Sequence, residues 1–510
     1  MTDTIDMQSE EIEIKLILPP EQASSFRRST LLRDHKSARA KTARLVSKYF
    51  DTPALTLRQN KVALRIREAG QMREQTFKWS RAESAGLQSR TEFNMPVTSD
   101  QPDLSVLELP ELEELRLQPD DLKKVRPVFA SHISRTTWLL DFNGSKIEVA
   151  LDEGEIVSGK KSLPVSEIEL ELVSGKATDL VDLAILIAKR LDVCPATDSK
   201  AGRGYALFQD EKPSAAKVKS PDLTGKMPVR AAFQGFMQAG IKQLLANRSI
   251  ILEGDDPEGV HQGRVAIRRM RAALSVFKPV LEEGSLSKAK LELRWMQQEL
   301  GPARDWDVFL EETISPLKSR MPDDRSLKNL EKLARQKREQ HYRQAWDFLN
   351  SRRFATSVLW FERWLLEIGE DDRCKESLPD FAAKLLNKRR KAARKKAGPD
   401  VTALPDTTLH ELRIELKKLR YAASLFKSLY PKEKSRPYMD QLSVLQDCLG
   451  GLNDAAVQQH LFDELKEAET PADRRAQSIV AGWHAAHTLA GLDHLEALWR
   501  DFSAVEPFWR

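Results

Sequence analysis

Charged and apolar residues alternate along several short segments in the first third of the chain. These segments lie at residues 11–15, 64–67, 76–79, 90–92, 148–152 and 167–172. Because successive side chains of a strand point to opposite faces, each segment predicts a strand with one charged and one apolar face. About eight candidate strands precede residue 175, and eight strands can close a small antiparallel barrel. The pattern therefore predicts a multidomain α+β protein with an N-terminal eight-stranded antiparallel β-barrel.

The period of the apolar positions changes along the chain and marks the expected domains. Short amphipathic helices outside the barrel are expected at 20–33, 110–124 and 177–191. Residues 211–228 are polar, contain proline and have no period, which is typical of a linker. From residue 229 onward the period is helical almost throughout. We therefore expect a tunnel domain at 1–210, a linker at 211–228 and an all-α domain at 229–510.

The helical half contains an internal repeat with an offset of 149 residues. Its first motif consists of His261, Arg264, Arg268, Arg269 and Arg271, and it returns as His410, Arg413, Lys417, Lys418 and Arg420 (410 minus 261 is 149). Further on, Leu300, Gly301 and Asp305 return at the same offset as Leu449, Gly450 and Asp454. A constant offset over this length predicts two helical units, at about 229–375 and 376–510, that pack with approximate two-fold symmetry.

The charges on the predicted strands form two opposed sets. Acid-rich strands lie at 11–13 and 167–171, and base-rich strands lie at 65–67 and 78. A single strand of this kind more often exposes its charged face to water. Repetition over six strands favours a barrel with inward charges, because acids and bases then offset the cost of each other's burial. Such a lumen can hold a divalent metal ion together with a polyanion.

The composition narrows the class of protein. A chain of 510 residues suggests two or three domains, and 41% hydrophobic with 31% charged residues predicts real cores under a very polar surface. No run of 18 apolar residues occurs, so no membrane-spanning segment is expected, and the polar N-terminus argues against a secretory signal. The three cysteines fit no metal or disulfide spacing. These features predict a cytoplasmic location.

The strand segments resemble a known family in their sequence and order. The resemblance is carried by Glu11-Ile12-Glu13-Ile14-Lys15, Tyr49-Phe50-Asp51-Thr52-Pro53, Ala63-Leu64-Arg65-Ile66-Arg67, Thr76-Phe77-Lys78, Ser166–Glu171 and Ser199–Tyr205. Over about residues 8–208 the chain resembles CYTH domains, which include triphosphate tunnel metalloenzymes, thiamine triphosphatases and class IV adenylate cyclases. The resemblance implies an eight-stranded tunnel, Mg²⁺ or Mn²⁺, and substrates that carry a triphosphate.

The charged residues of these segments can be assigned roles from their chemistry, and the roles match what the resemblance implies. Carboxylate oxygens suit Mg²⁺, and the expected ligands are Glu11, Glu13, Glu167 and Glu169, supported by Asp152 and Glu171. Arginine and lysine suit phosphoryl oxygens, and the expected set is Lys15, Arg65, Arg67, Lys78, Arg90, Arg135, Lys200 and Arg203. The base that deprotonates the attacking water is open between Glu13 and a Lys78–Tyr49 pair, as proposed within the family.

Some of these residues have ordinary alternatives. Asp51-Thr52-Pro53 is as typical of a turn as of a site. Glu171 could face solvent at the end of its strand. Arg135 could form an ion pair at the rim instead of contacting phosphate.

The repeated basic motif predicts a cationic stripe on each copy. Positions 0, +3, +7 and +10 of a helix fall within about one quarter of its circumference, so His261, Arg264, Arg268 and Arg271 share a face. Val260, Ile267, Met270 and Leu274 should then pack inward. A solvated basic face is the usual explanation for one copy. Two copies at a fixed offset favour a bound anion, and protonation of the histidines would strengthen binding at lower pH.

The motif, with its Leu-Gly and Asp, resembles the CHAD domain over about residues 229–505. The resemblance implies two pseudo-symmetric four-helix bundles with a basic surface that binds inorganic polyphosphate. In the second copy, Lys417 and Lys418 replace an arginine pair, so the first copy is expected to bind more tightly. The basic run 388–396 predicts a solvated helix that could extend the polyanion surface or contact nucleic acid without sequence specificity.

Together these patterns predict hydrolysis of inorganic triphosphate to pyrophosphate and phosphate, with polyphosphate as a second partner. One alternative is cyclisation of ATP by the same tunnel, as in class IV adenylate cyclases. Another is a non-catalytic polyphosphate-binding protein. The motifs address phosphates and metal only, so they do not rank inorganic, nucleoside and thiamine triphosphates, and they leave the oligomeric state open.

Overall fold

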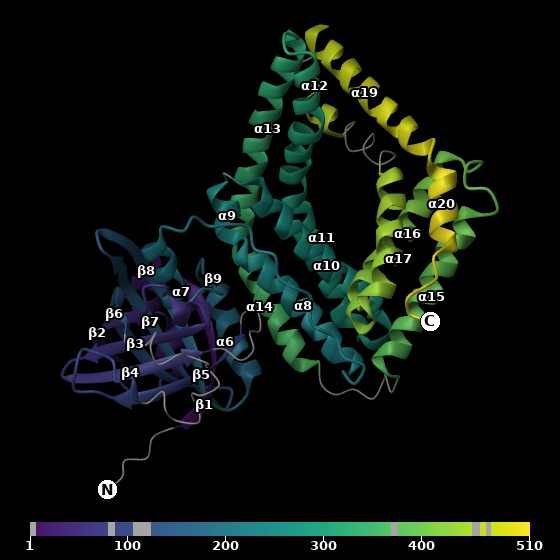
Figure 1. The fold of residues 1–510 in the computed structure, drawn as a ribbon. Helices are drawn as coiled ribbons and strands as arrows, with labels where there is room; N and C mark the ends of the chain where they lie inside the picture. Colours follow the sequence, from purple (N-terminus) through teal and green to yellow (C-terminus); the bar gives the residue numbers. More distant parts are fainter. Residues whose placement is uncertain are drawn as a thin grey trace. The chain divides into compact units, whose positions relative to one another are not determined.

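The computed structural model describes residues 7–79, 87–105, 124–254, 256–368, 376–450, 460–465 and 471–510. The chain forms two compact units (Figure 1). The first consists of residues 1–214 together with 349–369, and the second of 215–348 together with 370–510. The segment 349–369 lies outside the N-terminal domain that the sequence pattern outlined, since it comes from the middle of the helical half.

The first unit is built on one antiparallel sheet. Its strands are β1 (Met7–Ile17), β2 (Lys41–Asp51), β3 (Val62–Ala69), β4 (Met72–Trp79), β5 (Leu87–Pro96), β6 (Arg126–Phe142), β7 (Ser145–Ser158), β8 (Lys161–Ser174) and β9 (Cys194–Pro195). They follow the order β5-β4-β3-β2-β6-β7-β8-β1-β9, and β1 also pairs with β5. The pairings of the eight long strands thus return to β1, and the two-residue β9, which was not predicted, adds to β1.

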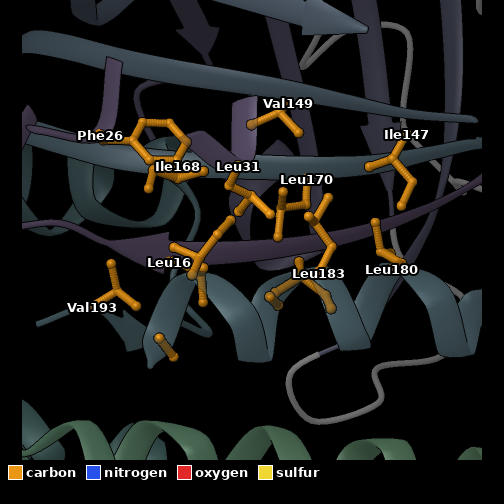
Figure 2. Packing of buried hydrophobic residues seen from close by; sticks show 14 of the residues in the cluster. Leu16, Phe26, Leu31, Ile147, Val149, Ile168, Leu170, Leu180, Leu183 and Val193 are labelled. Carbon is orange, nitrogen blue, oxygen red and sulfur yellow. The ribbon is translucent and has the colours of Figure 1, made fainter. Parts of the chain in front are cut away.

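The predicted alternation is confirmed most clearly in β8. Ile168 and Leu170 are fully buried in the apolar layer outside the sheet, while Glu167 and Glu169 lie between them on the other face. Helix α6 (Ala177–Ala188) covers the apolar face, with Leu180 and Leu183 packed against the strands (Figure 2).

Other helices complete the first unit. Within the expected segment 20–33 the structure has a 3₁₀ turn, Pro20–Gln22, followed by α1 (Ala23–Arg27) and α2 (Thr30–His35). The short α3 is Thr56–Gln59, and α7 is Lys200–Gln209. Helix α7 packs against β6, β7 and β8. Residues 110–123 of the remaining expected helix lie outside the described residues.

A helix from the second half of the chain belongs to this unit. Helix α14 (Arg352–Glu367) packs against α6 and β9. Its Ala355 and Leu359 are buried in the same apolar layer as α6. The outer layer of the sheet is therefore assembled from two distant parts of the sequence.

The second unit is helical, and its helices follow the 149-residue offset. Its helices include α8 (Val229–Ala246), α9 (Arg248–Glu253), α10 (Pro257–Val276), α11 (Glu283–Val308), α12 (Ser315–Arg320), α13 (Arg325–Leu349), α15 (Leu378–Ala397), α16 (Asp406–Phe426), α17 (Lys432–Cys448), α19 (Pro471–Leu492) and α20 (Leu495–Ala504). The starts of α8, α10 and α11 are each 149 residues before those of α15, α16 and α17.

The two copies meet along α10 and α16. Phe277 and Phe426 are equivalent residues, again 149 apart, and their ring centroids are 5.7 Å from each other. Phe381 stacks on Phe277 with a centroid distance of 5.6 Å. The inward flank predicted for α10 is confirmed, because Val260, Ile267, Met270 and Leu274 are buried.

Candidate functional site

The sheet of the first unit surrounds a cavity of about 470 Å³. Side chains of β1, β2, β3, β4, β6, β7 and β8 and of helix α7 line it. Most of the predicted site residues meet there, namely Glu13, Lys15, Tyr49, Arg65, Arg67, Lys78, Arg135, Asp152, Glu169, Glu171 and Lys200. The side chains of Glu11 and Arg90, which were also predicted to take part, lie outside the described residues.

Three carboxylates form what we call the acidic wall: Asp152 on β7 with Glu167 and Glu169 on β8. Asp152 stands opposite Glu167 in the strand register. One oxygen from each of the three lies within 4.8 Å of the others. Asp152 is fully buried and Glu167 nearly so. Hard oxygen donors grouped at this spacing suit Mg²⁺ or Mn²⁺.

The acidic wall is held in the ionised form by surrounding cations. Burial by itself would raise the pKa of Glu169, but Lys15, Lys200 and Arg135 outweigh it and hold the pKa well below its ordinary value. Burial likewise opposes ionisation of Asp152, while Lys200 and Arg135 lower its pKa on balance. Both carboxylates are therefore charged at neutral pH and can serve as metal ligands.

Arg135 lies inside the cavity and does not form a pair at its rim. Its Nε and Nη2 atoms donate to the two oxygens of Asp152 at 2.7 and 2.6 Å. Nη2 also donates to Glu169. This forked contact fixes both the side chain and the acidic wall. The pairing partner was not predicted from the sequence, although Arg135 and Asp152 are directly opposite in the β6–β7 register.

Three further cations approach the acidic wall. Lys15 on β1 donates to Glu13 at 2.8 Å and to Glu169 at 2.7 Å. Lys200 at the start of α7 lies 2.6 Å from Asp152 and 3.0 Å from Glu169, and it also contacts Glu167. Arg203, one turn further along α7, donates to Glu167. Helix α7 thus brings two predicted phosphate-binding residues to the carboxylates.

Two arginines and a lysine form what we call the basic wall: Arg65 and Arg67 on β3 with Lys78 on β4. In the circuit of eight strands, β3 is four pairings from β8 in either direction, and β4 is four pairings from β7. The basic wall therefore lies across the cavity from the acidic wall.

The basic wall carries uncompensated positive charge. The Nε atoms of Arg65 and Arg67 are buried and have no hydrogen-bond partner within the described part of the chain. The like charge of Arg65, together with burial, lowers the pKa of Arg67 to about 10. Buried guanidinium groups in this situation favour an anionic ligand.

Both candidates for the general base lie in the cavity. The Oε1 atom of Glu13 is buried and has no hydrogen-bond partner among the described residues. Burial opposes its ionisation, but Lys15 and Lys78 lower its pKa on balance. Tyr49 and Lys78 line the same cavity, and the Tyr49 ring stacks on Phe129 with a centroid distance of 4.5 Å.

Asp51 has the structural role of the turn alternative. Its buried carboxylate accepts hydrogen bonds from the backbone N–H groups of Thr52, Leu57 and Arg58 at 2.7 to 3.0 Å. It also accepts one from the Tyr205 hydroxyl at 2.9 Å. These contacts fix the segment that leads into β3 and tie it to α7.

Sequence reasoning missed several polar residues of the cavity lining, namely Ser47, Arg58, Lys61, Glu74, Asn94, Ser131 and Ser199. Ser47 lies two residues before Tyr49 on β2, and Ser131 lies four before Arg135 on β6. Extending the two-residue period from the predicted residues would have identified both. Arg58 and Lys61 precede β3, where no strand period applies.

The cationic stripe of α10 is tied to neighbouring helices. Arg264 donates to the Gly301 carbonyl and, at 3.1 Å, to Asp305. Arg269 donates to Gln243 at 2.9 Å. The stripe keeps an exposed portion, since Arg268, Arg269 and Arg271 are exposed residues. Burial and Arg304 lower the pKa of His261, so this side chain is predominantly neutral at pH 7.

The second copy reproduces part of this arrangement. Arg420 donates to Gln446 at 3.0 Å, and the equivalent Arg271 donates to the equivalent Gln297. Arg413 is buried with an exposed fraction of 8%, whereas His410 is exposed. The second Asp of the repeat, Asp454, lies outside the described residues.

Comparisons with known proteins agree with this architecture. Residues 9–205 match the CYTH domain and residues 235–463 match the CHAD domain. An inorganic triphosphatase of Haemophilus influenzae is 34% identical over 205 residues, which are 39% of this chain and 55% of the relative. The chain thus spans little more than half of that relative's length. An uncharacterized protein of Mycobacterium tuberculosis is 26% identical over 458 residues, or 85% of this chain and 84% of the relative.

A solved structure is similar to the helical half. The CHAD domain from the plant Ricinus communis is 26% identical, covers 57% of this chain and 98% of its own, and has a TM-score of 0.49. Within the described residues, no helix is long and apolar enough to cross a membrane. The chain therefore contains a CYTH domain followed by a CHAD domain, as the sequence motifs predicted.

Proposed function

We propose that the first unit is an inorganic triphosphatase, which hydrolyses triphosphate to pyrophosphate and phosphate with Mg²⁺ or Mn²⁺, and that the second unit binds polyphosphate. The proposal rests chiefly on the opposition of the two walls across one cavity. Three clustered carboxylates lie on one side, and buried arginine Nε atoms without partners lie on the other. A metal ion with a bound polyanion satisfies both sides at once. The triphosphatase relative of H. influenzae supports the choice of reaction.

The acidic wall is the place for the metal. Asp152, Glu167 and Glu169 would hold it, because their oxygens are close together and are ionised at neutral pH. A bound Mg²⁺ or Mn²⁺ would supply charge neutralisation for the phosphates and activation of water. Glu13, which shares Lys15 with Glu169, lies next to this set.

The chain's own cations would bind and orient the substrate. Arg65 and Arg67 would bind phosphoryl oxygens through the N–H groups that face no protein acceptor. Lys15 and Lys200 would bridge from the acidic wall to the phosphates as point charges. Removal of the terminal phosphoryl group then depends mainly on positioning and on charge stabilisation in a water-poor cavity.

Glu13 is our first choice for the group that accepts the proton of the attacking water. Its Oε1 has no protein donor to compete with water among the described residues. Its lowered pKa ensures that it is ionised at neutral pH, although it also weakens it as a base. Tyr49 and Lys78 are the second choice, since both line the cavity.

Phosphate release from inorganic triphosphate, ATP and thiamine triphosphate, with Mg²⁺, Mn²⁺ or EDTA, tests the proposal. We expect metal-dependent release that favours inorganic triphosphate, and its loss in Glu169→Gln. Glu155→Gln is a matched control, because Glu155 is an exposed residue of β7. Cyclic AMP from ATP would instead support the cyclase. Tight polyphosphate binding without turnover under any metal would support a non-catalytic protein.

A further inference from the structure

Helix α14 stands out because its sequence position and its structural position disagree. It lies inside the segment that matches the CHAD domain, yet it packs in the unit that contains the CYTH domain. Figure 1 shows the green α14 next to α6 of the first unit. A division of the chain at the linker would therefore separate α14 from the elements that it contacts.

The face of α14 that meets the first unit is built for this contact. Arg352, Ala355, Leu359 and Arg363 occur at positions 0, +3, +7 and +11, which fall on one side of a helix. Ala355 and Leu359 are 1% exposed and belong to the apolar layer that contains α6. The arginines flank this apolar centre along the helix. We call these four residues the docking face.

Both arginines of the docking face have acidic partners on or just after α6. Arg363 Nε lies 2.5 Å from an oxygen of Asp182, which is part of α6. Arg352 Nε lies 2.7 Å from an oxygen of Asp192, a few residues beyond α6. The hydrogen bond from Arg352 lowers the pKa of Asp192, so this pair is charged on both sides. The docking face is thus matched to α6 in both shape and charge.

The helix that α14 covers is itself the outer support of the acidic wall. Leu180 and Leu183 of α6 pack in one cluster with Ile168 and Leu170 of β8 (Figure 2). These two strand residues alternate with Glu167 and Glu169, whose oxygens form the metal-sized group. Close-packed interiors transmit displacements from one layer to the next. A shift of α6 therefore moves the backbone that carries Glu167 and Glu169.

We propose that α14 is a positioning element for the acidic wall: by holding α6 in place from outside, it sets the spacing of Glu167 and Glu169 and thereby the metal affinity of the cavity. The catalytic unit is then discontinuous in sequence, and the helical half supplies one of its parts. This inference rests on the metal site of the proposed function but not on the identity of the substrate, since metal binding is measured without turnover.

The test uses the full chain and measures Mn²⁺ binding by calorimetry together with thermal unfolding. Arg363→Asp places two negative charges together at the docking face, and we expect Mn²⁺ binding to weaken roughly three- to tenfold, as for loss of an outer-shell support. The exchange Asp182→Arg with Arg363→Asp restores the pair with reversed polarity, and it should bring Mn²⁺ affinity back to within about twofold of wild type. Arg343→Asp is the charge-matched control, because Arg343 is an exposed residue outside the first unit.

The outcomes separate positioning from simple stabilisation. If Arg363→Asp lowers the unfolding temperature but leaves Mn²⁺ affinity unchanged, α14 only stabilises the unit and the proposal is wrong. The proposal also fails if the charge exchange restores stability without restoring affinity. If Arg363→Asp does not fold, the milder Leu359→Ala is held to the same two criteria.

Failure of the proposed function has a different signature. A wild-type protein that binds Mn²⁺ at the acidic wall but hydrolyses no triphosphate would contradict the triphosphatase and leave this comparison of variants intact. Loss of Mn²⁺ binding in Asp152→Asn locates the measured site.

Discussion

The cavity of the first unit and the cationic stripes of the second unit both gather many charges, but they do so in opposite ways. In the cavity, acids and bases are buried together and share partners, as Lys15 does with Glu13 and Glu169. On α10 the charges have one sign, and Arg268, Arg269 and Arg271 remain exposed to solvent. Water compensates the exposed stripe, whereas only opposite charges can compensate buried ones.

This difference bears on what each region can do. Interlocked charges hold one another at fixed distances, so the cavity has the preorganised geometry that catalysis requires. A one-sign stripe has no such constraint, and its attraction for a polyanion depends on charge density and on the surrounding salt. We expect substitutions in the cavity to change turnover and substitutions in the stripes to change affinity.

The largest effect should come from breaking the interlock of the cavity. Asp152→Asn removes a charge that Arg135 holds at 2.6 and 2.7 Å and that Lys200 approaches at 2.6 Å. We expect metal-dependent phosphate release to fall by about a hundredfold or more, because a metal ligand is lost and two buried cations lose their partner. Asp141→Asn, at an exposed position of β6, is the control. Release within a few fold of wild type would contradict our assignment of the acidic wall.

Salt should separate the two regions next. Raising the salt concentration from about 50 to 200 mM should weaken polyphosphate binding by about tenfold or more, because the exposed stripe is screened and counterions compete. Mn²⁺ binding in the buried cavity should change less. Calorimetry of both ligands on one sample measures the contrast, and equal salt slopes would show that the two regions do not differ in the way described.

Glu362 tests a third situation, a buried charge with no opposite partner. It is 3% exposed, its Oε1 has no hydrogen-bond partner among the described residues, and burial raises its pKa well above the ordinary value. The folded state thus holds a proton that the unfolded state releases, so stability falls as pH rises from the ordinary range of glutamate toward the raised pKa.

Replacement of this residue should remove the pH dependence. We expect Glu362→Gln to be more stable than wild type by roughly 1–2 kcal/mol near pH 8, with the difference shrinking toward pH 4.5. Denaturant unfolding at several pH values measures it. A difference that grows toward low pH would contradict the sign of the effect.

The smallest expected effect compares the two copies of the repeat. Arg268 and Lys417 are equivalent residues, and Arg268 lies over the Tyr421 ring at 5.9 Å. Because arginine offers a planar fork, Arg268→Lys should weaken polyphosphate binding by about threefold, and Lys417→Arg should strengthen it by a similar factor. Titration of the two variants side by side checks this. Changes of the same direction in both would show that fork geometry does not decide affinity here.

Much of the fold could be predicted from local patterns. The alternation at 167–172 identified β8 and the face to which its glutamates point. The offset of 149 residues anticipated helices whose starts obey it. Most of the predicted site residues do line one cavity, because a strand's two-residue period fixes which side chains share a face.

The sequence alone could not supply the partners. That Arg135 lies against Asp152, that Asp51 serves a turn and Tyr205, and that α14 joins the first unit all depend on contacts between residues far apart in the chain.

The sequence thus determined which residues are charged, which face of each strand or helix they occupy, and that the helical unit occurs twice. These properties follow from near neighbours along the chain, since backbone geometry fixes the periods of strands and helices. Tertiary structure decided that the acidic and basic walls face each other, which cations hold the carboxylates ionised, and where α14 packs. Those choices rest on close packing and on the cost of burying unpaired charge, and both are settled only when distant segments meet.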